Sequence, residues 1–285
     1  MKASGASESA QPSFFRVFAS SREPSSQGQQ KKPTRIVSTN VCADQLALAL
    51  VERSRIASVS RLSTEPQISN YAEAAKGIPV NNARAEEIVE LKPDLVLGDI
   101  YTGAHANRLS QSLGVPVHVI GAGASLDDVR KIVRGVAEAV GEPERGVAMI
   151  AAMDARIARA QSQPGAEITA LVYEPNGVSS GNGTLTHDVL KTAGLKNLAP
   201  ELMPGSYGTV PLELVIASAP RLLILDDAYT GTSSRAQSIL RHPAFRSLEG
   251  KSALYAMPSR LWICPGPWIA EAVEKLAAER ARLAP

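Results

Sequence analysis

Aromatic residues, cysteines and long apolar runs are all scarce in this chain of 285 residues. Only 4% of the residues are Phe, Trp or Tyr, so each Tyr and Trp can be weighed singly as part of a binding site. No run reaches the ~18 apolar residues of a membrane-spanning helix. The formal net charge of +2 argues against a general nucleic-acid binder, which usually carries a basic patch or stripe.

The two cysteines, Cys42 and Cys264, are too few for a structural zinc site and form no Cys-x-x-Cys motif. Three alternatives stay open for them. They are two small buried apolar residues, the two ends of one long-range disulfide, or two thiols that face each other across a cleft. The count therefore leaves the redox compartment undecided.

The N-terminal segment 1–33 is rich in Ser and Gln, and we expect it to be a flexible leader outside the fold. It contains no recognisable secretory signal. The chain as a whole is 44% apolar and 20% charged, which is typical of a globular protein with enough interior for real cores.

One pattern occurs twice, at residues 86–98 and 212–226. Each copy has a glutamate at or next to its first residue, Glu86 or Glu213, continues as a short helix, stops at a proline and ends in an aliphatic run. The run is typical of a buried strand of a parallel sheet. Two such units predict two similar α/β lobes, and two lobes predict a cleft between them.

Strands and helices alternate over residues 35–140, as they do in a mainly parallel sheet covered by helices. A helix of about 19 residues then follows from Pro143 to about Gln161, and it is long enough to cross between lobes. The alternation restarts at Ile168. These patterns predict an N-terminal α/β lobe over 34–141, a linking helix over 142–162 and a C-terminal α/β lobe over 163–285.

Four phrases in this order carry a resemblance to a known family. They are Asn-Val-Cys-Ala-Asp-Gln at 40–45, Ala-Glu-Glu-Ile-Val-Glu-Leu-Lys-Pro-Asp-Leu-Val-Leu at 85–97, Ser-Gly-Asn-Gly-Thr-Leu at 180–185 and Leu-Trp-Ile-Cys-Pro-Gly-Pro at 261–267. Over about 34–283 the chain resembles the substrate-binding proteins of ABC importers for iron-siderophores, heme and cobalamin.

The resemblance implies an α/β fold of two Rossmann-like lobes with mainly parallel sheets, joined rigidly by a single long α-helix. It implies a periplasmic monomer that binds a metal chelate and delivers it to an importer permease. It implies no enzymatic activity, no cofactor, no protein-bound metal and no nucleic-acid partner. The 85–97 phrase indicates the family well and the ligand poorly.

In the family each lobe presents an acidic residue to arginines of the permease, and the matching positions are Glu86 and Glu213. The alternative is that each glutamate only opposes the dipole of its helix, where such a charge contributes ~0.3–1 kcal/mol. The resemblance favours docking.

Ligands of such folds bind where the strand ends and loops of both lobes converge. Aromatic rings there suit a corrin, a porphyrin or a catechol, and arginines suit anionic groups. Packing of Trp262 beneath the last helix and solvation of Arg61 are the alternatives to ligand contact. His105 is a weaker candidate. The predicted ligand-binding residues are Arg61, Tyr101, Tyr207, Tyr229, Arg260 and Trp262.

Among ligands we expect an iron-siderophore first, cobalamin second and heme third, because two arginines favour an anionic chelate. An enzyme on the same fold is the first rival. The loop 121–125 hints at a dinucleotide site, but Leu126 stands where the third glycine of the motif belongs. A scaffold that binds a partner protein without any small ligand is the second rival.

Overall fold

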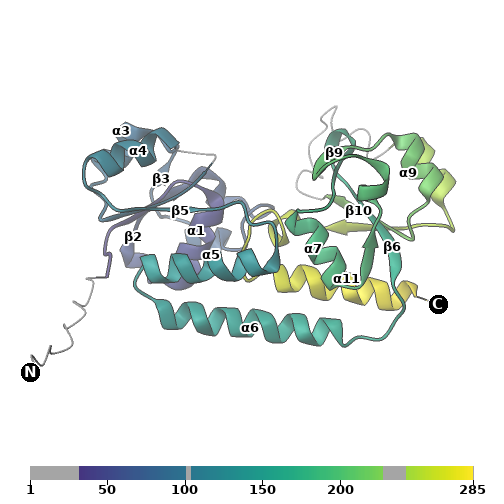
Figure 1. The fold of residues 1–285 in the computed structure, drawn as a ribbon. Helices are drawn as coiled ribbons and strands as arrows, with labels where there is room; N and C mark the ends of the chain where they lie inside the picture. The colour runs from purple at the N-terminus through teal and green to yellow at the C-terminus, as the bar shows by residue number, and fades with distance from the viewer. Residues whose placement is uncertain (1–31, 101–103, 227–241, 285) are drawn as a thin grey trace, which may run out of the picture. The chain divides into compact units, whose positions relative to one another are not determined.

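The computed structural model describes residues 32–100, 104–226 and 242–284. The predicted leader, 1–33, lies outside the described residues except for its last two. The described N-terminal lobe contains a five-stranded parallel sheet of order β3-β2-β1-β4-β5 (Figure 1). Its strands are β1 Ile36–Ser38, β2 Ile56–Ser60, β3 Val80–Asn81, β4 Leu95–Asp99 and β5 Val117–Ile120. Its helices are α1 Val41–Leu50, η1 Arg53–Arg55, η2 Arg61–Thr64, α2 Ala72–Ala75, α3 Ala85–Glu90, α4 Ala104–Ser112 and α5 Leu126–Ala139.

The C-terminal lobe contains a four-stranded parallel sheet of order β11-β10-β6-β8 and a separate antiparallel pair, β7 and β9. The strands are β6 Ile168–Tyr173, β7 Val178–Ser180, β8 Leu195–Asn197, β9 Tyr207–Thr209, β10 Leu222–Asp226 and β11 Ala253–Met257. The described helices are η3 Pro175–Gly177, α7 Leu185–Thr192, α8 Ala199–Leu202, α9 Leu212–Ser218, η5 Pro243–Leu248, η6 Ser259–Leu261 and α11 Ile269–Leu283. The two parallel sheets confirm the predicted fold class.

The repeated pattern forms a helix followed by a sheet strand in each lobe. The first copy forms α3 and β4, and the second forms α9 and β10. The order β5-β4-β1-β2 in one lobe is matched by β11-β10-β6-β8 in the other. The residue before each proline also adopts a left-handed conformation, with φ of 46° at Lys92 and 39° at Ala219. The same tight exit from helix to strand is thus built twice.

The linking helix, α6, spans Pro143–Gln161 and begins with a proline in its first turn, where the missing N–H costs nothing. Its buried side of Ile150, Met153 and Ile157 packs against α5 of one lobe and α11 of the other, and Figure 1 shows it running beneath both. The ion pair between Arg156 and Glu274 joins α6 to α11.

One continuous hydrophobic core runs through both lobes. It contains Leu46 and Val133 of the N-terminal lobe, Met153 of α6, and Val189 and Leu276 of the C-terminal lobe, all 0–1% exposed. Apolar faces of α5, α6 and α11 therefore meet in a shared interior. Such an interior packs the linking helix as part of the fold.

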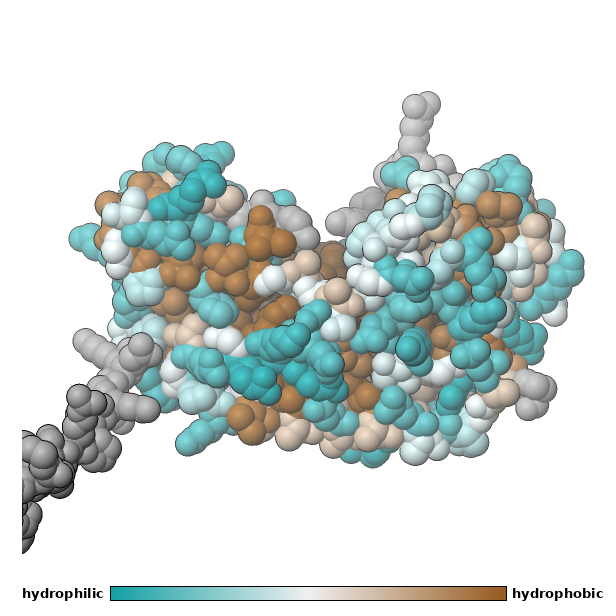
Figure 2. Space-filling view, in the orientation of Figure 1, coloured by the Kyte–Doolittle hydropathy of each residue, from teal (hydrophilic) through white to brown (hydrophobic). Residues whose placement is uncertain are grey.

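Large apolar side chains with more than a third of their surface exposed occur on both lobes, among them Leu62, Leu214 and Ile263. On the face shown in Figure 2, apolar residues form separate areas among polar ones. Among the described helices, none combines the length and the apolar character needed to cross a membrane.

Candidate functional site

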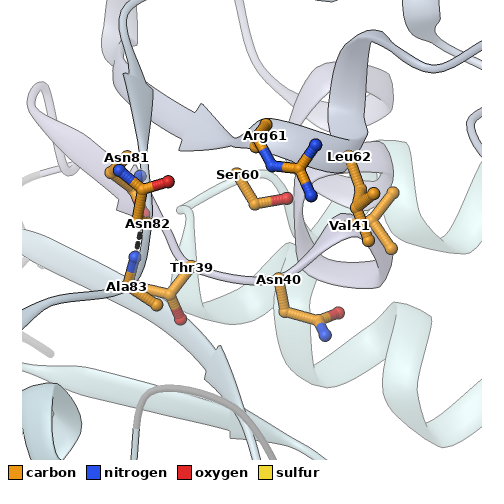
Figure 3. A pocket seen from close by; sticks show the side chains of 9 residues that line it. All are labelled: Thr39, Asn40, Val41, Ser60, Arg61, Leu62, Asn81, Asn82 and Ala83. Atoms are coloured by element: carbon orange, nitrogen blue, oxygen red, sulfur yellow. Dashed lines mark hydrogen bonds between the residues drawn. The ribbon is translucent and has the colours of Figure 1, made fainter.

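A pocket of about 390 Å³ opens at the carboxyl edge of the N-terminal sheet. Three chain segments line it, and each directly follows or ends a strand: 39–41 after β1, 60–62 at the end of β2, and 81–83 at the end of β3. In Figure 3, Asn81, Asn82 and Ala83 line one side and Val41 and Leu62 the other, with the Arg61 guanidinium between them. The carboxyl ends of parallel strands are where α/β folds bind ligands.

Two buried or capping amides fix the shape of this pocket. Asn81 is 2% exposed, and its Nδ2 donates to the carbonyl of Ser38 and to Oγ of Ser58, both at 2.8 Å. Asn40 accepts a hydrogen bond from the backbone N–H of Cys42 at 2.7 Å and thereby caps α1. The positive end of the α1 dipole thus lies at the pocket, which adds to the Arg61 charge in favouring an anionic ligand group.

A buried carboxylate supports the pocket from α1. Asp44 is 0% exposed, and both of its oxygens accept from the backbone N–H of Ser60 at 3.1 Å. The Ser60 hydroxyl donates to the same carboxylate. Burial raises the pKa of Asp44 to about 6, and the hydrogen bonds from Ser38 and Ser60 oppose that rise.

Asp44 makes the stability of the fold depend on pH. Because the pKa is about 6 in the folded state and near 3.8 without burial, the folded state holds the proton more tightly. The stabilisation that comes from protonating Asp44 in the folded state is therefore complete below about pH 4. It is lost as pH rises through about 6. We expect a loss of about 3 kcal/mol over that interval, which Asp44→Asn should remove.

Urea unfolding at closely spaced pH values between 4 and 7 measures this effect. The substitution Asp127→Asn, which removes one exposed carboxylate, provides the matched control. If the free energy of unfolding varied with pH identically in the wild type and in Asp44→Asn, the pH dependence could not be assigned to Asp44.

Of the predicted ligand-binding residues, Arg61 lines the pocket just described. Tyr207 begins β9 of the C-terminal lobe and is 67% exposed, opposite Ser180 of β7. Tyr101 and Tyr229 lie outside the described residues. His105 is exposed in the first turn of α4.

Arg260 and Trp262 are not among the residues that line the Arg61 pocket. Nη1 of Arg260 donates to Oδ1 of Asn70 at 2.8 Å, and the Asn70 amide donates back to the Arg260 carbonyl. Arg260 lines a second pocket, which contains no residue of the Arg61 pocket. Trp262 is 7% exposed and belongs to the large core, which is the arrangement that the packing alternative describes. A large ring after a 3-10 turn packs inward here because the apolar start of α11 lies against η6.

The structure joins Cys42 and Cys264 in a disulfide, one of the three alternatives that their number leaves open. Cys42 is in the first turn of α1, and Cys264 precedes α11. The bond therefore connects the helix beside the Arg61 pocket to the C-terminal lobe.

The glycine-containing loop 121–125 serves a contact between the lobes. A Cβ at Gly123 would lie 2.9 Å from Cβ of Pro265. The carboxylate of Asp188 accepts the backbone N–H of Leu126 at 2.7 Å, at the start of α5. A dinucleotide phosphate would need that helix end, and the chain's own carboxylate already occupies it.

Glu86 and Glu213 are both exposed in the first turns of α3 and α9. Neither side chain caps its helix. Sequence reasoning missed the polar residues Asn40, Asn81 and Asn82 of the pocket. Asn40 opens the 40–45 phrase, which is a signal that could have identified it, whereas Asn81 and Asn82 lie at the end of the two-residue strand β3 and carry no such signal. Among the described residues, no cluster of three metal-ligating side chains occurs.

Comparison with known proteins gives a consistent result. A family model described as periplasmic binding protein matches residues 36–250. Among solved structures, the periplasmic heme-binding protein RhuT of Roseiflexus sp. RS-1 has 25% identity and a TM-score of 0.74, and covers 88% of this chain and 99% of its own.

Two further solved structures share the fold. The periplasmic vitamin B12 binding protein BtuF of Vibrio cholerae has 17% identity and a TM-score of 0.67, covering 88% of this chain and 98% of its own. An Fe3+-hydroxamate transport protein of Saccharomonospora viridis has 20% identity and a TM-score of 0.67, covering 87% and 93%. A search of curated protein sequences finds no match.

Proposed function

This chain belongs to the periplasmic binding protein family, and we propose that it binds a metal chelate and delivers it to the permease of an ABC importer. The observation that carries the proposal is the pocket at the carboxyl edge of the N-terminal sheet, with Arg61 in its lining. Its volume is within the range of small-molecule sites, about 300–1,000 Å³. The chelate is transported cargo, and the chain's own residues would hold it reversibly.

A ferric siderophore with anionic groups is the first ligand that we propose. The Arg61 guanidinium and the N-terminus of α1 both favour negative charge at the N-terminal side of the site. Amide groups of Asn40 and Asn82 in the lining suit the carbonyl and hydroxyl oxygens of such a chelate.

Heme is the second candidate, favoured by two observations. Tyr207 offers an exposed ring on the C-terminal lobe, and a flat macrocycle gains most from such a face. The related RhuT is a heme-binding protein by its name. Heme propionates would then pair with Arg61. Cobalamin, the ligand in the name of the Vibrio cholerae relative, is the third candidate.

The proposed site of action is the periplasm. The relatives are periplasmic by name, and the disulfide between Cys42 and Cys264 suits an oxidising compartment. The family consists of binding proteins, which disfavours the enzyme alternative. A scaffold without a small ligand would have little use for a polar pocket that carries an arginine.

Titration with a ferric hydroxamate, a ferric catecholate, heme and cyanocobalamin tests the proposal, followed by tryptophan fluorescence and absorbance. One ligand should bind with Kd below ~10 μM, roughly −7 kcal/mol. Arg61→Gln should weaken binding of an anionic ligand about tenfold, since a charge-assisted hydrogen bond contributes about 1.5–3 kcal/mol. Arg108→Gln removes an exposed arginine from α4 and is the control that should leave affinity unchanged. Absence of binding by all four ligands would refute the importer function.

A further inference from the structure

A second pocket, of about 520 Å³, is formed by three segments that are far apart in sequence. Residues 70–71 come from the N-terminal lobe, four residues come from the middle of α6, and the remainder come from 260–271, between η6 and the first turn of α11. We call it the junction pocket. None of its lining residues belongs to the Arg61 pocket.

The walls of the junction pocket present aromatic and thioether groups. Tyr71 and Trp268 meet edge to face, with ring centroids 6.2 Å apart and an angle of 67° between the rings. The indole N–H of Trp268 donates to the Cys264 carbonyl at 2.9 Å, so the polar atom of this ring is already satisfied, and 7% of the residue remains exposed. Met149 of α6, which is partly buried, completes the wall with an adaptable side chain, and Met153 lies beneath it in the core at 1% exposed.

The charges around this pocket leave one cation uncompensated. Arg156 is paired with Glu274 at 2.5 Å, and Glu271 lies 3.7 Å from Lys275. Arg260, in contrast, has no carboxylate within ion-pair distance among the described residues, and its guanidinium donates to the neutral side-chain amide of Asn70.

Arg260 is also held in place before any ligand arrives. Asn70 accepts from its guanidinium at 2.8 Å, and Gln45 in turn accepts from the Asn70 backbone N–H and side-chain amide, both at 2.8 Å. Gln45 is completely buried. A ligand anion would therefore meet a guanidinium whose orientation is already fixed, which reduces the entropy lost on binding.

We propose that the junction pocket is a second binding site, for a small planar aromatic carboxylate. The ring would lie against Tyr71, Trp268 and Met149, and the carboxylate would pair with Arg260. Because the lining comes from both lobes and α6, the bound molecule would contact all three and stabilise their arrangement.

Binding of naphthalene-2-carboxylate tests this proposal, with 2-naphthamide as the neutral analogue and 2-naphthylmethylammonium as the cationic one. Isothermal titration calorimetry should give the carboxylate an affinity at least about tenfold higher than either analogue, as expected for one charge-assisted pair. Arg260→Met should abolish that preference while the neutral analogue still binds.

Two alanines on α6 provide a matched pair that does not depend on Arg260. Ala152 and Ala151 are both exposed, but only Ala152 lines the pocket. Ala152→Phe should fill the site and lower the affinity at least about tenfold, whereas Ala151→Phe should not. Equal affinities for the three probes, equal effects of the two phenylalanines, or weaker binding in Arg61→Gln would overturn the assignment. The last result would mean that the probe occupies the other pocket, and it leaves the metal-chelate function untouched.

Discussion

Replacing Cys42 and Cys264 together by alanine is expected to lower the free energy of unfolding by about 2–5 kcal/mol. The disulfide closes a segment with a sequence separation of 222 residues, which includes most of both lobes. Closing so long a loop removes much conformational freedom from the unfolded chain, and the chain-entropy model places the effect near the upper end of that range.

Urea denaturation with and without a thiol reductant measures this effect. The oxidised wild type should lose stability when reductant is added, and the double alanine variant should not respond to it. Mass spectrometry without reduction should also find no free thiol in the wild type. A wild type whose unfolding midpoint is indifferent to reductant would show that the bond is absent or contributes nothing.

The double substitution Glu86→Ala and Glu213→Ala is expected to abolish import while leaving chelate affinity unchanged. The two exposed carboxylates lie in equivalent first turns of α3 and α9, one on each lobe. If each meets an arginine of the permease, both charge pairs are lost at once. Truncating one partner of such a pair costs about 2–5 kcal/mol when the pair is buried in the complex.

Uptake of labelled chelate into cells or permease-containing vesicles is the measurement, together with a separate titration of the free protein. Glu90→Ala with Glu249→Ala is the matched control, because it removes the same charge from exposed positions of the same two lobes. Normal uptake by the Glu86 and Glu213 variant would falsify the docking role. Equal losses in both double variants would assign the effect to net charge.

The sequence predicts the large parallel elements well because they depend on local patterns. The apolar runs of β4 and β10, the prolines after α3 and α9, and the length of α6 are all evident from periodicity and helix stops. Short elements are not evident from such patterns. The strands β3 and β7 have two and three residues, and they exist because neighbouring strands or loops supply their hydrogen bonds.

Local sequence patterns locate Arg61 of the candidate site, but they do not locate Arg260 and Trp262. Arg61 follows a recognisable strand, so its place at the edge of the sheet follows from topology. The roles of Arg260 and Trp262 depend on where the chain turns between β11 and α11. That turn is set by contacts with Asn70, 190 residues away, and by the core. No local pattern encodes such a contact.

The hydrophobic interior shared by the lobes has a further consequence. A chain cut at either end of α6 would leave Leu46 and Val133 on one fragment and Val189 and Leu276 on the other, each without part of its packing. The internal repeat therefore corresponds to two lobes of similar architecture, but these lobes are not two independently folding domains. Neither half is expected to be a viable protein by itself, and a gene encoding only one of them would yield a fragment prone to aggregation.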